Sequence, residues 1–233
     1  MSHKELRLVA VQETTRTPAQ EPVDPPTATK YKVDSNSILW HLCIMAKKTA
    51  LSRIGKTPIT TKELERQGIS RNEIQGLVQA EKILRIGRGV YQLAEVELSD
   101  ESQYRAATKR IKGPTAVCLL SALAHYNLTD EIPKRVWLLV DANRKSYLKD
   151  VRLFRSHKPR WKVGILEAEG YRITTLERTI VDAILYQHKL GTLGTDALKK
   201  ALSAKQTTAS KIMEMAERLG VAERVLPYLQ VLA

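Results

Sequence analysis

The stretch from Thr57 to Leu93, TPITTKELERQGISRNEIQGLVQAEKILRIGRGVYQL, decides the fold of the first part of this chain. Thr60 and Glu63 have the spacing of a capping box, in which hydroxyl and carboxylate oxygens accept the free N–H groups at a helix start. Gly68 favours a helix end a few residues later, because glycine tolerates the left-handed backbone conformation. The pattern predicts one short helix ending at Gly68.

A second capping box follows directly after this glycine. Ser70 and Glu73 again have the T/S-x-x-E spacing, and they open a helix predicted over Arg71 to Ala80. Only Gly68, Ile69 and Ser70 separate the two helices. Two short helices joined by a three-residue turn that contains glycine are typical of a helix-turn-helix.

The second helix has two faces of different character. Ile74, Leu77 and Val78 recur at helical spacing and should face the core. Amide side chains can pair with adenine edges in the DNA major groove, and glycine permits close approach. The alternative is an ordinary solvated face, although such faces more often carry Glu–Lys pairs. The face that we expect to read DNA carries Arg71, Asn72, Gln75, Gly76 and Gln79.

Residues 83–93 are typical of two short strands around a glycine-rich turn. A hairpin directly after a helix-turn-helix is a wing, so we predict a winged helix-turn-helix DNA-binding domain over residues 36–95. Arg85 on a strand and Arg88 at the tip are placed to meet phosphates or an adjacent minor groove. Lys82, at the junction of helix and wing, is a further candidate.

The composition supports a polyanionic partner. The 233 residues include 38 Lys and Arg against 25 Asp and Glu, a net charge of +13, with 43% hydrophobic and 27% charged residues. These fractions exclude collagen-like, coiled-coil and wholly disordered chains, and no apolar run is long enough to span a membrane. Residues 1–35 are neutral, whereas residues 36–95 carry +5 and residues 134–162 carry +8. Two basic regions favour nucleic acid over a merely solvated surface.

The chain is predicted to divide into three parts. Residues 1–35 are polar and proline-rich, which predicts a disordered tail. An apolar helix is expected over Ser37–Lys48, and its wide stripe also allows an alternative function as a docking module for a protein partner. Residues 96–233 should form an α+β domain. Cys43 and Cys118 lie in apolar stretches and are expected to be buried free thiols.

Helices and strands alternate irregularly in this second domain. A helix over Thr115–Tyr126 is expected to be buried all round, and Thr174 with Glu177 should cap a helix that runs to about Leu190. The other expected elements are a helix over 100–112, strands over 135–140 and 151–155, a hairpin over 164–174, and two or three final helices, one ending at Gly220.

The second basic region falls on these strands and loops. We expect the strand over 151–155 to carry one basic face. Trp161 could stack on a base, but one aromatic residue is more often packed. A solvated surface is the alternative to phosphate binding. The candidate auxiliary phosphate contacts are Arg144, Lys145, Lys149, Arg152 and Arg155.

No catalytic residues, metal ligands or cofactor site are expected. The five histidines lack metal-ligand spacing, and the RxxxxH pattern of Arg152 to His157 falls on a predicted strand. Glu167 and Glu169 lack the lysine of a metal nuclease, and Arg178 with Asp182 should form a helix-surface ion pair. The alternative of a different class is a nuclease that a winged helix delivers to its substrate.

Several motifs, in this order, resemble the AbiEi-like antitoxins of type IV toxin–antitoxin and abortive-infection systems. They are GISRNEIQGLVQAEKILRIGRGVYQL at 68–93, SALAHYNLTDEIP at 121–133, RVWLLV at 135–140, ITTLERTIVDAI at 173–184 and LGVAERVLPYL at 219–229. The chain departs from the family at Ala80-Glu81-Lys82, where relatives tend to carry a basic residue and glycine.

The resemblance implies a function in two parts. Such proteins repress their own operon by binding inverted repeats in promoter DNA, an arrangement compatible with cooperative or dimeric binding. They also counter a co-encoded nucleotidyltransferase-type toxin, usually without a stable complex, and the C-terminal domain is assigned this antitoxin role. The free cysteines and the lack of a signal peptide or membrane span lead us to expect a cytoplasmic protein with no membrane partner. The resemblance adds a bacterial, nucleoid-associated location.

Overall fold

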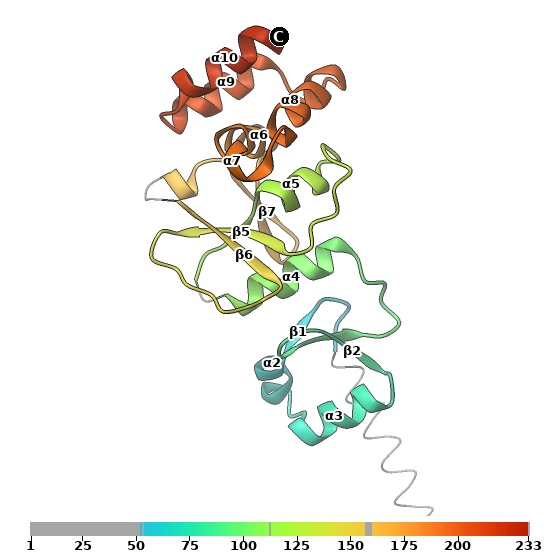
Figure 1. Ribbon diagram of the computed structural model, residues 1–233. Helices are drawn as coiled ribbons and strands as arrows, with labels where there is room; N and C mark the ends of the chain where they lie inside the picture. The colour runs from blue at the N-terminus through green and yellow to red at the C-terminus, as the bar shows by residue number, and fades with distance from the viewer. Residues whose placement is uncertain (1–51, 53, 112, 157–159, 233) are drawn as a thin grey trace, which may run out of the picture. The chain divides into compact units, whose positions relative to one another are not determined.

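The computed structural model describes residues 52, 54–111, 113–156 and 160–232 (Figure 1). The tail expected over residues 1–35 and the helix expected over Ser37–Lys48 lie outside the described residues, as does Cys43. The described residues form a mixed α+β structure, which confirms the predicted class. We call residues 54–96 the N-terminal module and residues 100–232 the C-terminal module.

The N-terminal module has two helices and a three-stranded sheet. Both predicted capping boxes are present, at the starts of α2 and α3. The strands are antiparallel in the order β1-β3-β2. The helices and strands of this module are β1 (Ile59–Thr60), α2 (Thr61–Arg66), α3 (Arg71–Gln79), β2 (Ile83–Gly87) and β3 (Val90–Leu93).

A small apolar core holds these elements together. Leu64 of α2, Ile69 of the turn and Leu77 of α3 are all buried in it. They pack with Ile83 and Leu93 from the hairpin. Burial of such side chains stabilises a fold by roughly 1.5–3 kcal/mol each, so this core fixes the hairpin against both helices.

The C-terminal module is built on a mixed five-stranded sheet of order β6-β5-β4-β8-β7. β5 and β6 are parallel, as are β4 and β8, while the other pairs are antiparallel. Its elements are α4 (Asp100–Arg110), β4 (Ala116–Val117), α5 (Leu119–His125), β5 (Val136–Asp141), β6 (Val151–Ser156), η1 (Arg160–Lys162), β7 (Ile165–Ala168), β8 (Tyr171–Thr174), α6 (Leu176–Leu185), α7 (Gln187–Leu190), α8 (Leu193–Ser203), α9 (Ala209–Arg218) and α10 (Ala222–Leu232).

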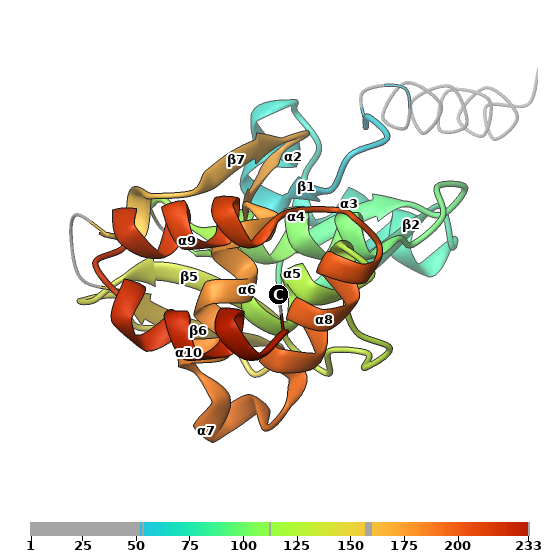
Figure 2. The ribbon, with the colours of Figure 1, turned by 90° about the horizontal axis from the view of Figure 1, so that it is seen from above.

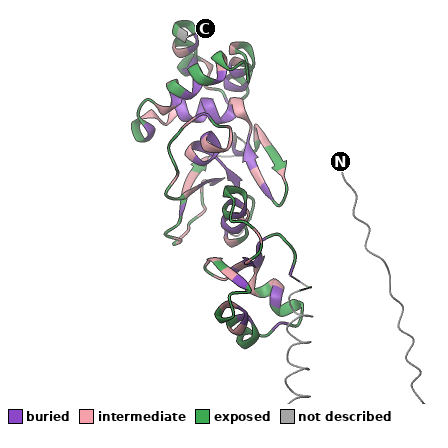
Figure 3. Ribbon diagram, turned by 90° about the vertical axis from the view of Figure 1, so that its right-hand side faces the viewer, coloured by how far each residue is buried: buried purple, intermediate pink, exposed green. Residues whose placement is uncertain are grey.

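Both faces of this sheet are covered. Along β5, Trp137 and Leu139 pack into the cluster formed with α5, α6 and α8 to α10, whereas Leu138 and Val140 pack toward α4. Figure 2 shows α6 among α8, α9 and α10. Buried residues therefore gather on the inward sides of helices and strands, and exposed ones lie on the outer turns (Figure 3).

The helix expected over Thr115–Tyr126 is wrong at its start. Ala116 and Val117 form strand β4, which pairs with β5 on one side and β8 on the other, and the helix begins only at Leu119. A continuous apolar run is compatible with a buried central strand as well as with a buried helix, so the sequence pattern does not distinguish the two structures. Cys118 is a buried free thiol, as expected, and burial raises its pKa.

The start of α6 also differs by one residue. Thr174 ends strand β8, where its hydroxyl contacts that of Thr179 at 2.7 Å, and Thr175 is the residue that caps the helix by accepting the N–H of Arg178. The helix ends at Leu185 and a separate short helix, α7, runs to Leu190. The expected α4, the β7–β8 hairpin and the helix end before Gly220 are confirmed.

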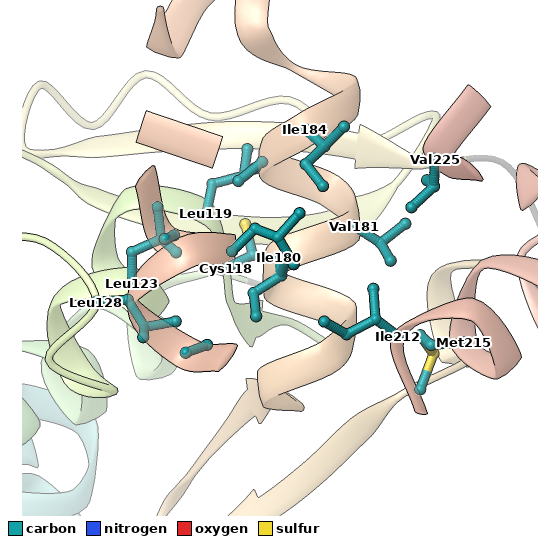
Figure 4. Packing of buried hydrophobic residues seen from close by; sticks show 14 of the residues in the cluster. Cys118, Leu119, Leu123, Leu128, Ile180, Val181, Ile184, Ile212, Met215 and Val225 are labelled. Atoms are coloured by element: carbon teal, nitrogen blue, oxygen red, sulfur yellow. The ribbon is translucent and has the colours of Figure 1, made fainter. Parts of the chain in front are cut away.

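The ion pair of Arg178 and Asp182 is not on the surface. Arg178 Nε donates to Asp182 Oδ2 at 2.6 Å, and the two side chains are only 2% and 7% exposed. Helix α6 has no solvated side around Arg178 and Asp182 because α5, α8 and α9 surround it. Its residues Ile180, Val181 and Ile184 are buried in the apolar cluster that these helices form (Figure 4). Burial raises the pKa of Asp182 although Arg178 opposes the shift.

Strand β6 does not have one basic face. The guanidinium carbon of Arg152 lies 4.3 Å from the centre of the Trp137 ring, on the face of the sheet that α6 covers. Arg155 instead donates to the carbonyl of Arg144, on the side where Leu153 packs toward α4. Residues three apart on a strand point to opposite faces, so these arginines belong to different surfaces.

Candidate nucleic-acid interface

Helix α3 is positioned by contacts close in sequence. Ser70 N donates to Glu73 Oε2 at 2.7 Å, and Glu73 N donates back to Ser70 Oγ at 3.3 Å. Gly68, with φ of +81°, closes the preceding turn. Ile74 and Leu77 then anchor one side of the helix in the core. The opposite side is therefore presented to solvent in a fixed orientation.

The exposed side of α3 brings together the predicted amide side chains. Asn72, Gln75 and Gln79 are all exposed and recur at i, i+3 and i+7, which places them on one face. Each amide offers a donor and an acceptor at its tip. Such a face can form paired hydrogen bonds with the edges of bases without adding charge.

Gly76 lies within this face, in the middle of the helix. A Cβ added there would meet no heavy atom within 4 Å, so packing inside the protein does not require a glycine. Glycine inside a helix costs about 1 kcal/mol relative to alanine. Neither packing inside the protein nor helix propensity accounts for a glycine at this position.

The β2–β3 hairpin is tied to the start of α2. Thr61 donates its backbone N–H at 2.9 Å and its hydroxyl at 3.2 Å to the carbonyl of Gly89, the residue with φ of +71° in the hairpin turn. Arg85 and Arg88 are exposed on this hairpin, as predicted. The role of Thr61 has no local sequence signal, because its partner lies 28 residues away.

Arg71 and Lys82, at the two ends of α3, are both exposed. Arg71 Nε donates to Glu65 Oε1 at 2.7 Å, which joins α3 to α2 and raises the pKa of the guanidinium. Lys82 follows Glu81, whose φ is +53°. A left-handed conformation is one that glycine adopts more readily than glutamate does.

The end of α4 connects the two modules. Lys109 Nζ donates to the Pro58 carbonyl at 2.7 Å and lies 3.3 Å from Glu63. Burial alone would raise the pKa of Glu63, but hydrogen bonds from its capping partner and from Lys109 lower it. The sequence does not reveal these contacts, because the partners lie about 50 positions away.

Arg110, the next residue, is largely buried. Its guanidinium bonds both carboxylate oxygens of Asp150. The hydrogen bond from Arg110 lowers the pKa of Asp150. A Cβ added at Gly87, in strand β2, would lie 2.8 Å from Nη1 of Arg110. One arginine thus contacts the hairpin and the connection between β5 and β6.

The predicted auxiliary residues do not form one surface. Lys145, Lys149 and Arg155 are exposed around the β5–β6 connection. Arg144 is half-buried against Gly113, and Arg152 belongs to the opposite side of the sheet. Trp161, a candidate for stacking, is 5% exposed and packed, so it does not offer its ring to a base.

The carboxylates considered for a nuclease are engaged in ion pairs. Glu167 pairs with Arg172 at 2.5 Å, and Glu169 pairs with Arg105 at 3.4 Å. Among the described residues, no three His, Cys, Asp or Glu side chains gather closely enough to hold a metal ion. Within the same ranges, no helix is long and apolar enough to cross a membrane.

Comparison with known proteins identifies one family. Residues 49–94 match the family described as transcriptional regulator, AbiEi antitoxin. The match covers the elements from β1 to β3 and confirms the resemblance for this segment. No curated protein matches the chain. The matched family is one of regulators and antitoxins rather than enzymes.

Proposed function

We propose that this chain, whose residues 49–94 match the AbiEi regulators, is a DNA-binding transcriptional autorepressor and antitoxin of a type IV toxin–antitoxin system. In this proposal residues 36–95 form a winged helix-turn-helix, residues 96–233 form the antitoxin domain and residues 1–35 form a tail. Its partners are inverted repeats in its own promoter and a co-encoded nucleotidyltransferase-type toxin. It acts in the bacterial cytoplasm, at the nucleoid.

Helix α3 would enter the major groove of the operator. Asn72, Gln75 and Gln79 would pair with base edges, each good bidentate pair contributing about 1–3 kcal/mol of discrimination. Gly76 would let the helix backbone approach the bases. The charged residues of the same surface would hold the phosphates: Arg71, Lys82, Arg85 and Arg88.

The C-terminal module would add phosphate contacts of lower specificity. Arg144, Lys145, Lys149 and Arg155 surround one side of the β5–β6 connection, and Arg152 lies on the other face. Contacts of this kind raise affinity for any sequence and make it depend on salt. They would support cooperative or dimeric binding along the operator.

One observation carries the DNA-binding proposal above the others. An exposed helix face in the matched segment combines three amides with a glycine that has open space around it. A solvated face would gain stability from alanine at that position. Recognition of bases at short range explains both the residue types and the glycine.

The test is binding of the full chain to its native upstream DNA, measured by fluorescence anisotropy at two salt concentrations. The variant Asn72→Ala/Gln75→Ala should bind the operator about 10- to 1000-fold more weakly, while its binding to unrelated DNA stays unchanged. Gln206→Ala removes an exposed amide from the C-terminal module and is the matched control. Unchanged operator affinity in the double variant would show that α3 does not read the bases.

The antitoxin part is tested by growth. The neighbouring reading frame is expressed from one inducible promoter and this chain from another. Expression of the toxin then does not depend on repression of the native promoter. Wild type and Asn72→Ala/Gln75→Ala should both restore growth, because neutralisation is assigned to the C-terminal domain. Failure of both to rescue would refute the antitoxin role and leave the operator result standing.

A further inference from the structure

The connection between β5 and β6, residues 142–150, is held at its start, middle and end. Arg155 Nε donates to the carbonyl of Arg144 at 2.8 Å. Leu148 packs into the apolar cluster beneath α4. Asp150 is bonded by the buried guanidinium of Arg110. Because strands β5 and β6 are parallel, this segment must return along the sheet, and these contacts fix its path.

Within this fixed segment the side chains alternate. Lys145, Tyr147 and Lys149 are exposed, whereas Ser146 and Leu148 between them are half-buried. Only one residue separates Tyr147 from Lys145 on one side and from Lys149 on the other. The segment thus presents an aromatic ring with an exposed lysine near it in the chain on each side.

The exposure of Tyr147 has no explanation in the fold. Its side chain is 94% exposed, the highest value among the exposed large hydrophobic residues of the described chain. A tyrosine usually covers apolar surface or bonds through its hydroxyl. A ring displayed in this way, on an anchored segment, is suited to stack on a flat partner at low entropic cost.

The surrounding charge restricts the partner to a polyanion. Residues 134–162 contain ten basic residues and only two acidic ones, Asp141 and Asp150. The Asp150 carboxylate is already bonded by Arg110. A ligand that is both polyanionic and rich in flat aromatic faces is a nucleic acid whose bases are unpaired, since a duplex stacks its bases inside the helix.

We propose that Lys145, Tyr147 and Lys149 form a binding site for an unpaired nucleic-acid strand, in which Tyr147 stacks on a base and the lysines hold the flanking phosphates. This site lies in the C-terminal module and goes beyond operator recognition by α3. RNA and single-stranded DNA share this chemistry, and the experiment below distinguishes them.

Binding of the full chain to fluorescein-labelled oligo(rU), oligo(dT) and an unrelated duplex of equal length tests the site. Tyr147→Ala should weaken binding to the preferred single strand by about 5- to 100-fold, the range for loss of one stacked base. Tyr147→Phe keeps the ring and should bind within about twofold of wild type. Ile132→Ala truncates another exposed apolar side chain, 89% exposed, and is the matched control.

A photocrosslink locates the contact directly. A single strand carrying 5-iodouridine should crosslink to Tyr147, as identified by mass spectrometry of the modified peptide. The ratio of rU to dT affinities assigns the ligand as RNA or DNA. Asn72→Ala/Gln75→Ala should bind the single strands as tightly as wild type does. A failure of the operator-binding proposal can therefore be told apart from a failure of the proposal for the Tyr147 site.

Three outcomes would overturn the proposal. These are equal binding by Tyr147→Ala and Tyr147→Phe, a loss of duplex binding in Tyr147→Ala as large as its loss of single-strand binding, and Tyr147-dependent binding to vesicles with 30% phosphatidylserine but not to the oligonucleotides. The melting temperature of Tyr147→Ala should match that of wild type, because Tyr147 is almost fully exposed in the folded protein and its ring adds little to stability.

Discussion

The N-terminal and C-terminal modules reach a fixed structure by different means. In the N-terminal module, residues three apart cap both helices, as at Thr60–Glu63 and Ser70–Glu73. In the C-terminal module, several side chains are also held by partners far along the chain, as for Arg110 and Asp150, 40 residues apart. The first therefore presents a defined uncharged face, and the second presents charge on a connection fixed by distant contacts.

The largest expected effect tests whether the modules are stable independently. Asp182→Ala leaves Arg178 buried without its carboxylate, which should destabilise the C-terminal module by about 3–5 kcal/mol. Hydrogen exchange measured by mass spectrometry should show lost protection in α6, α8 and α9 and retained protection in residues 54–93. Asp196→Ala, at an exposed position in α8, is the control. Equal loss in both modules would mean that they unfold as one unit.

A smaller effect sharpens the functional side of the comparison. Gly76→Ala should stabilise the N-terminal module by about 1 kcal/mol, because alanine favours the helix and has open space there. The same methyl group should weaken operator binding at the surface proposed to meet the bases. Urea unfolding and anisotropy measure the two effects.

Ser210→Ala, an exposed exchange on α9, controls for a general gain in helix propensity. Operator binding that improves along with stability in Gly76→Ala would show that the bases do not approach this glycine.

The smallest effect concerns pH. The pKa values of Glu63 and Asp150 are lowered in the folded protein. The hydrogen bonds that lower them, from Thr60 and Lys109 to Glu63 and from Arg110 to Asp150, therefore contribute stability above about pH 4, near the ordinary carboxyl pKa. This stability is lost as the pH falls through the lowered values. Both carboxylates are partly exposed, so each loss should be about 1 kcal/mol or less.

Urea unfolding at pH 7, 5, 3.5 and 2.5 measures this loss. The stability difference between wild type and Asp150→Asn isolates the contribution of Asp150, and it should be constant from pH 7 to 5 and shrink below pH 4. A difference that persists unchanged at pH 2.5 would contradict the assignment.

The same contrast explains what could be predicted from the sequence. Caps, glycine turns and the two faces of α3 are local, so Ser70, Gln75 and Gly89 lie where their neighbours in sequence place them. The module boundaries and the roles of the DNA-facing residues stay predictions. The errors fall where distant segments decide the environment.

Two of those errors have a common physical origin. Val117 is a strand residue because β5 and β8 flank it, although its apolar neighbours suit a helix equally well. Arg178 and Asp182 have the spacing of a surface pair, but α5, α8 and α9 cover their helix. Neither partner strand nor covering helix is visible in a local pattern. Tyr147 is a different case. Its position between two lysines can be read from the sequence, but the structure is needed to show that its ring is exposed.

The contact of Gly87 with Arg110 also constrains how this protein can change over generations. A side chain gained at position 87 of strand β2 would press on the end of the Arg110 side chain, which would have to shift. Such a shift would disturb the bidentate hydrogen bonds from Arg110 to Asp150. A library that varies Gly87 alone should therefore favour glycine and other small residues, and varying position 110 together with it should widen the set of residues that position 87 tolerates.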